Sequence, residues 1–318
     1  MKKQSKKFML AGVVLLAIAG LLALTSCKND SVPEPPSEAD WLQEQKKELE
    51  DKTEGTITAP SYLTKGGLVD LAKLLCDLPD GVQVDLDLSQ ATGLTYIAPG
   101  AFIGCPTLQS VKLPSSVTEI GQYAFHNCYN LTSVTIPANV KTIGKSAFAF
   151  TDLTKVAIPE GVTTIGAYAF QLCSSLAEVT IPEGVTTIED WAFSSCSSLA
   201  EVTIPEGVTT IKNGAFSSCS NLAEVTIPEG VTTIGYSAFA YTGLTEVTIP
   251  ASVTTIGNMA FGNCTNLTSV TFKETGGWRT KNPYDGAESP DPINVDTPST
   301  NAEKLREGDW HNKYLIRK

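Results

Sequence analysis

A phenylalanine recurs through the centre of this 318-residue chain at an almost constant interval. It occupies Phe102, Phe125, Phe148, Phe170, Phe193, Phe216, Phe239 and Phe261, so that successive spacings are 22 or 23 residues. A period of about 20 to 29 residues is typical of a solenoid, in which short units stack. One such unit has no second layer to cover its apolar face, so only stacked neighbours can bury a core. The repeat therefore predicts a stack and places these phenylalanine rings inside it.

The unit that starts at Val208 shows the pattern within one repeat. Eight apolar positions recur from unit to unit: Val208, Ile211, Ala215, Phe216, Cys219, Leu222, Val225 and Ile227. Polar and apolar residues alternate from Glu224 to Ile227, which predicts a strand. Because successive side chains of a strand point to opposite faces, Val225 and Ile227 are expected to point inward and Glu224 and Thr226 toward solvent.

The spacing Leu222-x-x-Val225-x-Ile227, with Cys219 three residues before it, resembles the BspA-type leucine-rich repeat family, as do the Ile-Pro and Gly-x-x-Ala-Phe elements of the same units. The resemblance extends over about residues 85–272. It implies a β-rich α/β solenoid, a right-handed stack of about eight coils between N- and C-terminal caps, with Leu-x-x-Val-x-Ile as the strand that lines one face. It also implies a secreted or surface protein of a host-associated microbe that serves as a scaffold for protein binding and adhesion.

The first 26 residues have the order of a bacterial export signal. Four lysines precede an uncharged apolar run from Phe8 to Leu24, followed closely by Thr-Ser-Cys. This ending resembles the lipobox of bacterial lipoproteins, which implies that Cys27 is acylated and becomes the first residue of the mature chain. Lys28 favours outer-membrane delivery, so we expect a lipid-anchored protein of the outer membrane or cell surface of a Gram-negative bacterium. The alternative is a membrane-spanning helix, for which an apolar run of 17 residues is at the lower limit.

These patterns divide the chain into five segments. They are a signal peptide at 1–26, an acylated N-terminus with a tether and a charged helix at 27–55, an N-terminal cap with a degenerate first repeat at 56–101, the solenoid at 102–275, and a C-terminal cap at 276–318. Apolar spacing predicts helices at about 38–52 and 68–78, and alternation predicts a strand at 82–88. In the last segment Trp278, Trp310 and Tyr314 have no repeat partner. Buried rings would close the end of the stack, whereas exposed rings would form a glycan-binding patch.

The charge and the residue content of the chain argue against several classes of function. The chain has 34 acidic residues against 23 Lys and Arg, a net charge of −11, which argues against nucleic acid or an anionic lipid surface as the main partner. His126 and His311 are its two histidines, and His126 is expected in a solvated turn. There is no Gly-x-Ser-x-Gly elbow or phosphate loop. We predict no enzymatic activity, no cofactor and no metal, and contact with the membrane only through the lipid on Cys27.

Six cysteines occupy one repeat position: Cys105, Cys128, Cys173, Cys196, Cys219 and Cys264. Because free cysteine behaves as a small buried apolar residue, we expect a ladder of buried thiols. Disulfides and metal binding are the alternatives, but stacked parallel side chains have the wrong torsion for a disulfide and no Cys-x-x-Cys pair is present. Two units, at residues 148–153 and 239–244, lack the cysteine and one further residue, which predicts a tighter turn there.

The solvent-facing strand positions form two columns of polar residues. The predicted partner-binding residues are Glu178, Glu201, Glu224 and Glu246 in one column and Thr180, Thr203, Thr226 and Thr248 in the next. One interpretation is that the carboxylates keep the sheet soluble and discourage edge pairing. Our hypothesis is that this face docks a basic surface of a protein ligand, from the host matrix or from another cell-surface protein. A glycan-binding accessory lipoprotein is the second candidate function.

Overall fold

The computed structural model describes residues 35–49, 52–79, 81–282, 289, 295, 298–307, 310 and 313–317. The predicted signal peptide and the lipidation site Cys27 lie outside the described residues. Within the described ranges, no helix is long and apolar enough to cross a bilayer.

The N-terminal cap consists of α1 (Glu38–Leu49), β1 (Glu54–Thr58) and α2 (Lys65–Cys76), followed by β2 (Gln83–Asp87), which pairs in parallel with β1. Helix α2 begins three residues before the expected position because Thr64 caps it, its hydroxyl accepting a hydrogen bond from the Gly67 amide. The Glu38 carboxylate accepts hydrogen bonds from the amide and the hydroxyl of Thr64, which ties α1 to the start of α2.

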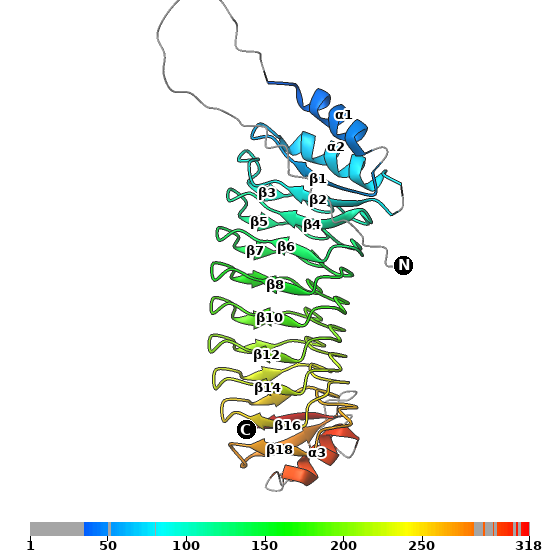
Figure 1. Cartoon of the computed structure of the whole chain (residues 1–318). Coiled ribbons are helices and arrows are strands. Elements are labelled where there is room, and N and C mark those ends of the chain that lie inside the picture. The colour runs from blue at the N-terminus through cyan, green and yellow to red at the C-terminus, as the bar shows by residue number, and fades with distance from the viewer. Residues whose placement is uncertain are drawn as a thin grey trace, which may run out of the picture. The chain divides into compact units, whose positions relative to one another are not determined.

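Each coil of the solenoid contributes one strand to each of two walls (Figure 1). The strands of the first wall are β4 (Leu108–Lys112), β6 (Ser133–Thr135), β8 (Lys155–Ala157), β10 (Glu178–Thr180), β12 (Glu201–Thr203), β14 (Glu224–Thr226), β16 (Glu246–Ile249) and β18 (Ser269–Phe272). Those of the second wall are β3 (Tyr96–Ile97), β5 (Glu119–Ile120), β7 (Thr142–Ile143), β9 (Thr164–Ile165), β11 (Thr187–Ile188), β13 (Thr210–Ile211), β15 (Thr233–Ile234) and β17 (Thr255–Ile256). Neighbouring coils pair in parallel, as Glu201 with Glu224 and Thr210 with Thr233. The predicted β-rich stack of eight coils is confirmed.

The repeated phenylalanines form a continuous stack of buried rings. Neighbouring ring centroids lie 5.2 to 5.5 Å apart and the ring planes are within 11° of parallel. The turns that carry these rings are also joined between coils, since the Phe125 amide donates to the Ala147 carbonyl at 2.8 Å and the Phe216 amide to the Ala238 carbonyl at 2.8 Å. The Ala-Phe element is therefore a tight turn that forms a third hydrogen-bonded wall.

Two residues of most turns adopt the left-handed backbone conformation, as Tyr123 (φ 59°) and Asn127 (φ 61°) do. This conformation costs a residue other than glycine about 1 to 2 kcal/mol. The amides of Tyr123 and Asn127 donate to carbonyls of the next coil at 2.9 and 3.0 Å, so stacking offsets the local strain. An isolated unit would lack these partners.

The first wall is interrupted where the sequence has its two short units. Its strands belong to three sheets. The first contains β4 and β6, the second contains β8, β10, β12 and β14, and the third contains β16 and β18. In the short units Thr151 and Thr242 stand at the cysteine position, and each hydroxyl donates to a phenylalanine carbonyl three residues before it at 2.8 Å. The loss of one residue before the next strand thus coincides with each break in the pairing of the first wall.

The far end of the stack is closed by β19 (Trp278–Lys281), α3 (Pro298–Arg306) and β20 (Tyr314–Arg317). Strand β20 pairs antiparallel with β17 and with β19, and α3 packs against β18 (Figure 1). Trp278 is 1% exposed and Trp310 is 3% exposed. Trp278 and Trp310 therefore belong to a cap and not to an exposed glycan-binding patch, and Tyr314 is half-buried on β20.

Candidate functional site

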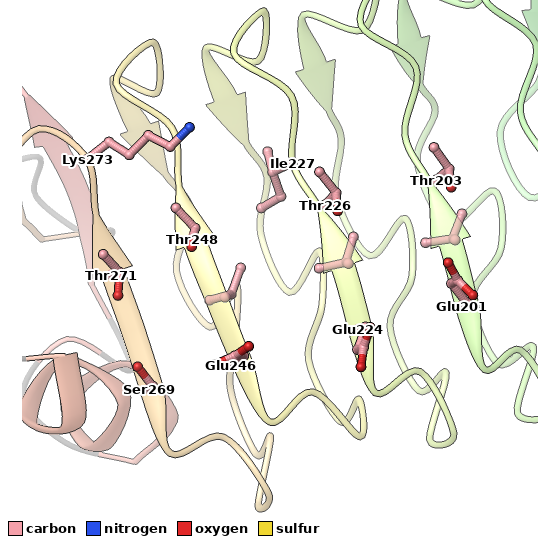
Figure 2. A pocket seen from close by; sticks show the side chains of 13 residues that line it. Glu201, Thr203, Glu224, Thr226, Ile227, Glu246, Thr248, Ser269, Thr271 and Lys273 are labelled. Atoms are coloured by element: carbon pink, nitrogen blue, oxygen red, sulfur yellow. The ribbon is translucent and has the colours of Figure 1, made fainter.

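The predicted glutamates and threonines all lie exposed on the outer face of the first wall. Strands β10, β12, β14 and β16 each place glutamate first, valine second and threonine third. Figure 2 shows Glu201, Glu224 and Glu246 in one row across successive strands, with Thr203, Thr226 and Thr248 in the next row. We call this surface the acidic strand face, defined by the predicted residues Glu178, Glu201, Glu224, Glu246, Thr180, Thr203, Thr226 and Thr248.

A shallow groove of about 460 Å³ lies on this face over β12, β14, β16 and β18. Three of the four predicted glutamates and three of the four predicted threonines line it; Glu178 and Thr180, on β10, do not. Ser269, Thr271 and Lys273 extend the lining onto the last coil (Figure 2).

The groove lies where strand pairing is broken between β14 and β16. Val225, expected to point fully inward, is half-buried, whereas the equivalent Val202 and Val247 are only 2% and 4% exposed. Val225 and Ile227 both contribute to the groove lining. The break in pairing thus gives the acidic strand face an apolar patch at its centre.

Two lysines flank the row of carboxylates. Lys155 forms an ion pair with Glu178 at 2.5 Å, and Lys273 forms one with Glu229 at 2.5 Å. The hydrogen bond from Lys273 lowers the pKa of Glu229. In the part of the chain that the structure describes, no ion pair involves Glu201, Glu224 or Glu246. The unneutralised charge therefore lies over the groove.

Lys273 is the charged groove residue that the sequence analysis did not predict. It directly follows the strand of the last coil, at the position where other units have the proline of Ile-Pro. This departure from the repeat is the feature of the sequence that could have identified Lys273 as a site residue. Proline cannot carry charge, so the substitution places a cation at one end of the row.

The six cysteines form the predicted ladder of buried thiols, and all seven described cysteines are free. Five of the ladder thiols donate to the phenylalanine carbonyl of the preceding coil: Cys128 to Phe102 (3.0 Å), Cys173 to Phe148 (3.1 Å), Cys196 to Phe170 (3.2 Å), Cys219 to Phe193 (3.1 Å) and Cys264 to Phe239 (3.0 Å). Burial raises the pKa of Cys173 to about 11 and that of Cys219 to about 12. These thiols stay protonated at neutral pH and fill space in the core.

His126 lies in a different environment from the one expected. Its ring contacts Tyr123 and Phe150 edge to face, and its Nδ1 is buried without a hydrogen-bond partner. Burial lowers the pKa of His126. His126 lies in a turn, as expected, but it is half-buried rather than fully solvated because aromatic residues of its own turn and of the next coil pack against the ring. Among the described residues, no group of three His, Cys, Asp or Glu side chains could hold a metal ion.

Solved structures with a similar fold come from bacteria. A leucine-rich repeat protein from Bacteroides ovatus is 32% identical with a TM-score of 0.58, over 61% of this chain and 50% of that one. The T. pallidum leucine rich repeat protein is 32% identical with a TM-score of 0.48, over 58% of this chain and 78% of that one. The chain therefore spans about half the length of the Bacteroides ovatus protein.

Comparison with protein families gives a match to the BspA type leucine rich repeat region, in six copies over residues 86–200 and 141–268. The matched residues make up more than half of the chain and coincide with the stacked coils. No curated protein matches the sequence. The stack of coils, its phenylalanine core and this match agree, and the chain belongs to the BspA type leucine-rich repeat family.

Proposed function

We propose that this chain is a surface-exposed, lipid-anchored scaffold that binds a partner protein through its acidic strand face. The observation that carries the proposal is the row formed by Glu201, Glu224 and Glu246, three exposed carboxylates beside a groove that have no ion-pair partner among the described residues. Repeat scaffolds of this kind present extended binding surfaces. Export and anchoring through Cys27 are supported by the signal-like first 26 residues.

The charge of this face favours a basic partner. The paired strands β12 and β14 place Glu201 and Glu224 about 4.8 Å apart, and two like charges about 4 Å apart repel by about 1 kcal/mol even in water. A lysine or arginine side chain of a partner would relieve that repulsion. The threonine hydroxyls of the next column can donate or accept hydrogen bonds beside it.

The groove adds an apolar contact to this charged surface. Val225 and Ile227 can pack against the aliphatic stem of an arginine or lysine while Glu224 and Glu246 contact its charged head. A bare charge row would attract any cation, whereas a groove with an apolar floor selects one that also has an apolar stem. We therefore favour a protein ligand with basic side chains over a glycan, because the two tryptophans of the proposed aromatic patch are buried.

The proposal predicts that replacing Glu201, Glu224 and Glu246 together by glutamine abolishes most of the binding. An exposed charge pair contributes about 0.2 to 1 kcal/mol, so three pairs account for about 0.6 to 3 kcal/mol and a loss of roughly threefold or more in affinity. Binding of the purified protein to immobilised matrix proteins and to whole cells, at low and moderate salt, measures this loss.

The matched control replaces Glu160, Glu183 and Glu206 by glutamine, since these carboxylates lie exposed in the Pro-Glu-Gly turns outside the groove lining. Both variants remove three negative charges, so an effect of net charge alone would weaken them equally. If the strand-face variant binds as tightly as the unmodified protein, and this binding does not depend on salt, then the acidic strand face is not the binding surface. The carboxylates would then serve only to keep the protein soluble. A glycan array probed in parallel tests the second candidate function.

A further inference from the structure

The third wall, which the Ala-Phe turns and the residues next to them form, presents apolar side chains to solvent. We call it the turn wall. It carries five of the six large apolar side chains that are exposed in the described part of the chain: Ile103, Tyr129, Leu172, Tyr236 and Tyr241. Of the four tryptophans, Trp41, Trp278 and Trp310 are buried in the caps, whereas Trp191 lies in a turn and is partly exposed. Exposed apolar surface of this kind indicates a binding site.

The Trp191 indole lies flat against the backbone of the next coil. Three consecutive atoms of its six-membered ring, Cδ2, Cε3 and Cζ3, would lie within 2.5 Å of a Cβ placed on Gly214. These atoms are almost equidistant from that point, so the face of the ring, and not its edge, covers the glycine. The opposite face of the ring points away from the backbone. Trp191 therefore offers one flat apolar face for stacking.

Gly214 makes room for this ring. Its φ of 60° is close to the 52° of Ser146 and the 50° of Ser237, which occupy the same position in other coils. The backbone conformation alone thus accepts a side chain here, whereas the indole does not, because a Cβ would collide with the ring. The ring is held in place before any ligand arrives, which lowers the ordering entropy that binding would cost.

A column of polar residues runs beside the ring and is fixed by hydrogen bonds between coils. The Asp190 carboxylate accepts from the Asn213 backbone amide at 3.0 Å, and the Asn213 side-chain carbonyl accepts from the Tyr236 backbone amide at 2.9 Å. The second carboxylate oxygen of Asp190 can still accept a hydrogen bond, and the side-chain amide of Asn213 can still donate one. The Tyr236 side chain is exposed one coil beyond Gly214, whose amide donates to the Tyr236 carbonyl at 2.8 Å.

The charges at this turn argue against an anionic ligand. The Lys212 ammonium forms an ion pair with the Glu189 carboxylate at 2.8 Å, so these two charges cancel. Asp190 then gives the turn a net negative charge, on a chain whose own net charge is −11. A sulfated or acidic ligand would be repelled. The ligand that fits is uncharged, with an apolar face and hydrogen-bonding groups at its edge.

We propose that Asp190, Trp191, Asn213 and Tyr236 form a binding site for a neutral carbohydrate, which we call the indole platform. One face of a sugar ring consists of C–H groups and stacks on the free face of the indole. The hydroxyls at the edge of the sugar donate to Asp190 and accept from Asn213. A stable protein interface buries about 800 Å² on each partner, whereas a single ring bordered by polar groups matches one sugar. The platform lies on the turn wall and does not depend on the function proposed for the acidic strand face.

Tryptophan fluorescence tests the indole platform directly, because Trp191 is the tryptophan that a soluble quencher can reach while the other three are buried. The purified protein is first applied to an array of neutral oligosaccharides of glucose, galactose, mannose and xylose, with sulfated forms beside them. The neutral oligosaccharides that bind are then titrated while quenching by acrylamide is followed. We expect a neutral oligosaccharide to protect the fluorescence from acrylamide in a saturable way, and its sulfated form to give no protection.

Titration calorimetry of three variants and one control makes the test specific. Trp191→Ala should weaken binding of the same oligosaccharide by roughly tenfold or more, as truncation of a central tryptophan does, whereas Trp191→Phe, which keeps a flat ring, should lose less. Gly214→Ser keeps the indole but places a Cβ beneath it, so it should also weaken binding. Serine is native at this position in two other coils, so the fold tolerates it. The control Tyr129→Ala removes an exposed ring from another coil of the turn wall and should bind normally.

The variant with Glu201, Glu224 and Glu246 replaced by glutamine should keep carbohydrate binding, which separates failure of the indole platform from failure of the acidic strand face. The proposal is overturned if no neutral oligosaccharide on the array protects the fluorescence, or if Trp191→Ala binds as tightly as the unmodified protein. A protein partner that is lost with Trp191→Ala, without any binding of sugar, would also overturn it and would assign the platform to a protein interface.

Discussion

Phe216→Ala is expected to lower the free energy of unfolding by about 3 to 5 kcal/mol, the usual cost of truncating a fully buried aromatic side chain. The Phe216 ring is completely buried, and its centroid lies 5.5 Å from those of Phe193 and Phe239. The truncation leaves a cavity in the stack that two rings border. Because stability of a stack is a sum over units and the contacts between neighbours, two such contacts are lost at once.

Equilibrium unfolding in denaturant measures this loss. The matched control is Tyr129→Ala, which truncates another aromatic side chain that is 58% exposed. Surface substitutions usually change stability by no more than about 0.5 kcal/mol. A loss below about 1 kcal/mol for Phe216→Ala would contradict a core built on stacked rings.

Cys27→Ser is expected to move the protein from the membrane fraction to the soluble fraction. A serine hydroxyl cannot form the thioether that would hold the lipid of a bacterial lipoprotein. Each buried methylene of an acyl chain contributes about 0.8 kcal/mol to membrane binding, so losing the chains removes the whole anchor. Cell fractionation of the variant, together with a mass spectrum of the mature N-terminus of the unmodified protein, measures the outcome.

Cys76→Ser is the control for that experiment, since it removes a thiol from the cap and leaves the signal intact. It should remain in the membrane fraction. An unmodified Cys27, or a mature chain that still begins at Met1, would show that the lipobox interpretation is wrong and that the first 26 residues have another role.

The stack, its core and the position of the acidic strand face were predictable from the sequence because they depend on period alone. A residue that recurs every 22 or 23 positions, such as Phe216, occupies the same place in each coil. Alternation within Glu224 to Ile227 then separates the outer face from the inner one. No side-chain geometry enters either inference.

The features that the sequence did not predict depend on contacts between coils. The ion pair of Lys155 with Glu178 joins residues 23 positions apart, and that of Lys273 with Glu229 joins residues 44 positions apart. The groove follows from the break in strand pairing between β14 and β16. The sequence shows the missing residue of the short unit at 239–244 but not the loss of pairing that accompanies it. The burial of Trp278 depends on the antiparallel pairing of β19 with β20, whose partners are far apart in the sequence.

The backbone hydrogen bonds that join the Ala-Phe turns of neighbouring coils run in one direction, each phenylalanine amide donating to the next coil, as Phe102 does to Ala124 and Phe125 to Ala147. Any interior coil therefore offers the same connections above and below as its neighbours do. The stretch from Cys173 to Ile188 is identical in sequence to that from Cys196 to Ile211. Duplication or loss of one such unit in the gene would lengthen or shorten the row of carboxylates by one, in register, without any change to either cap.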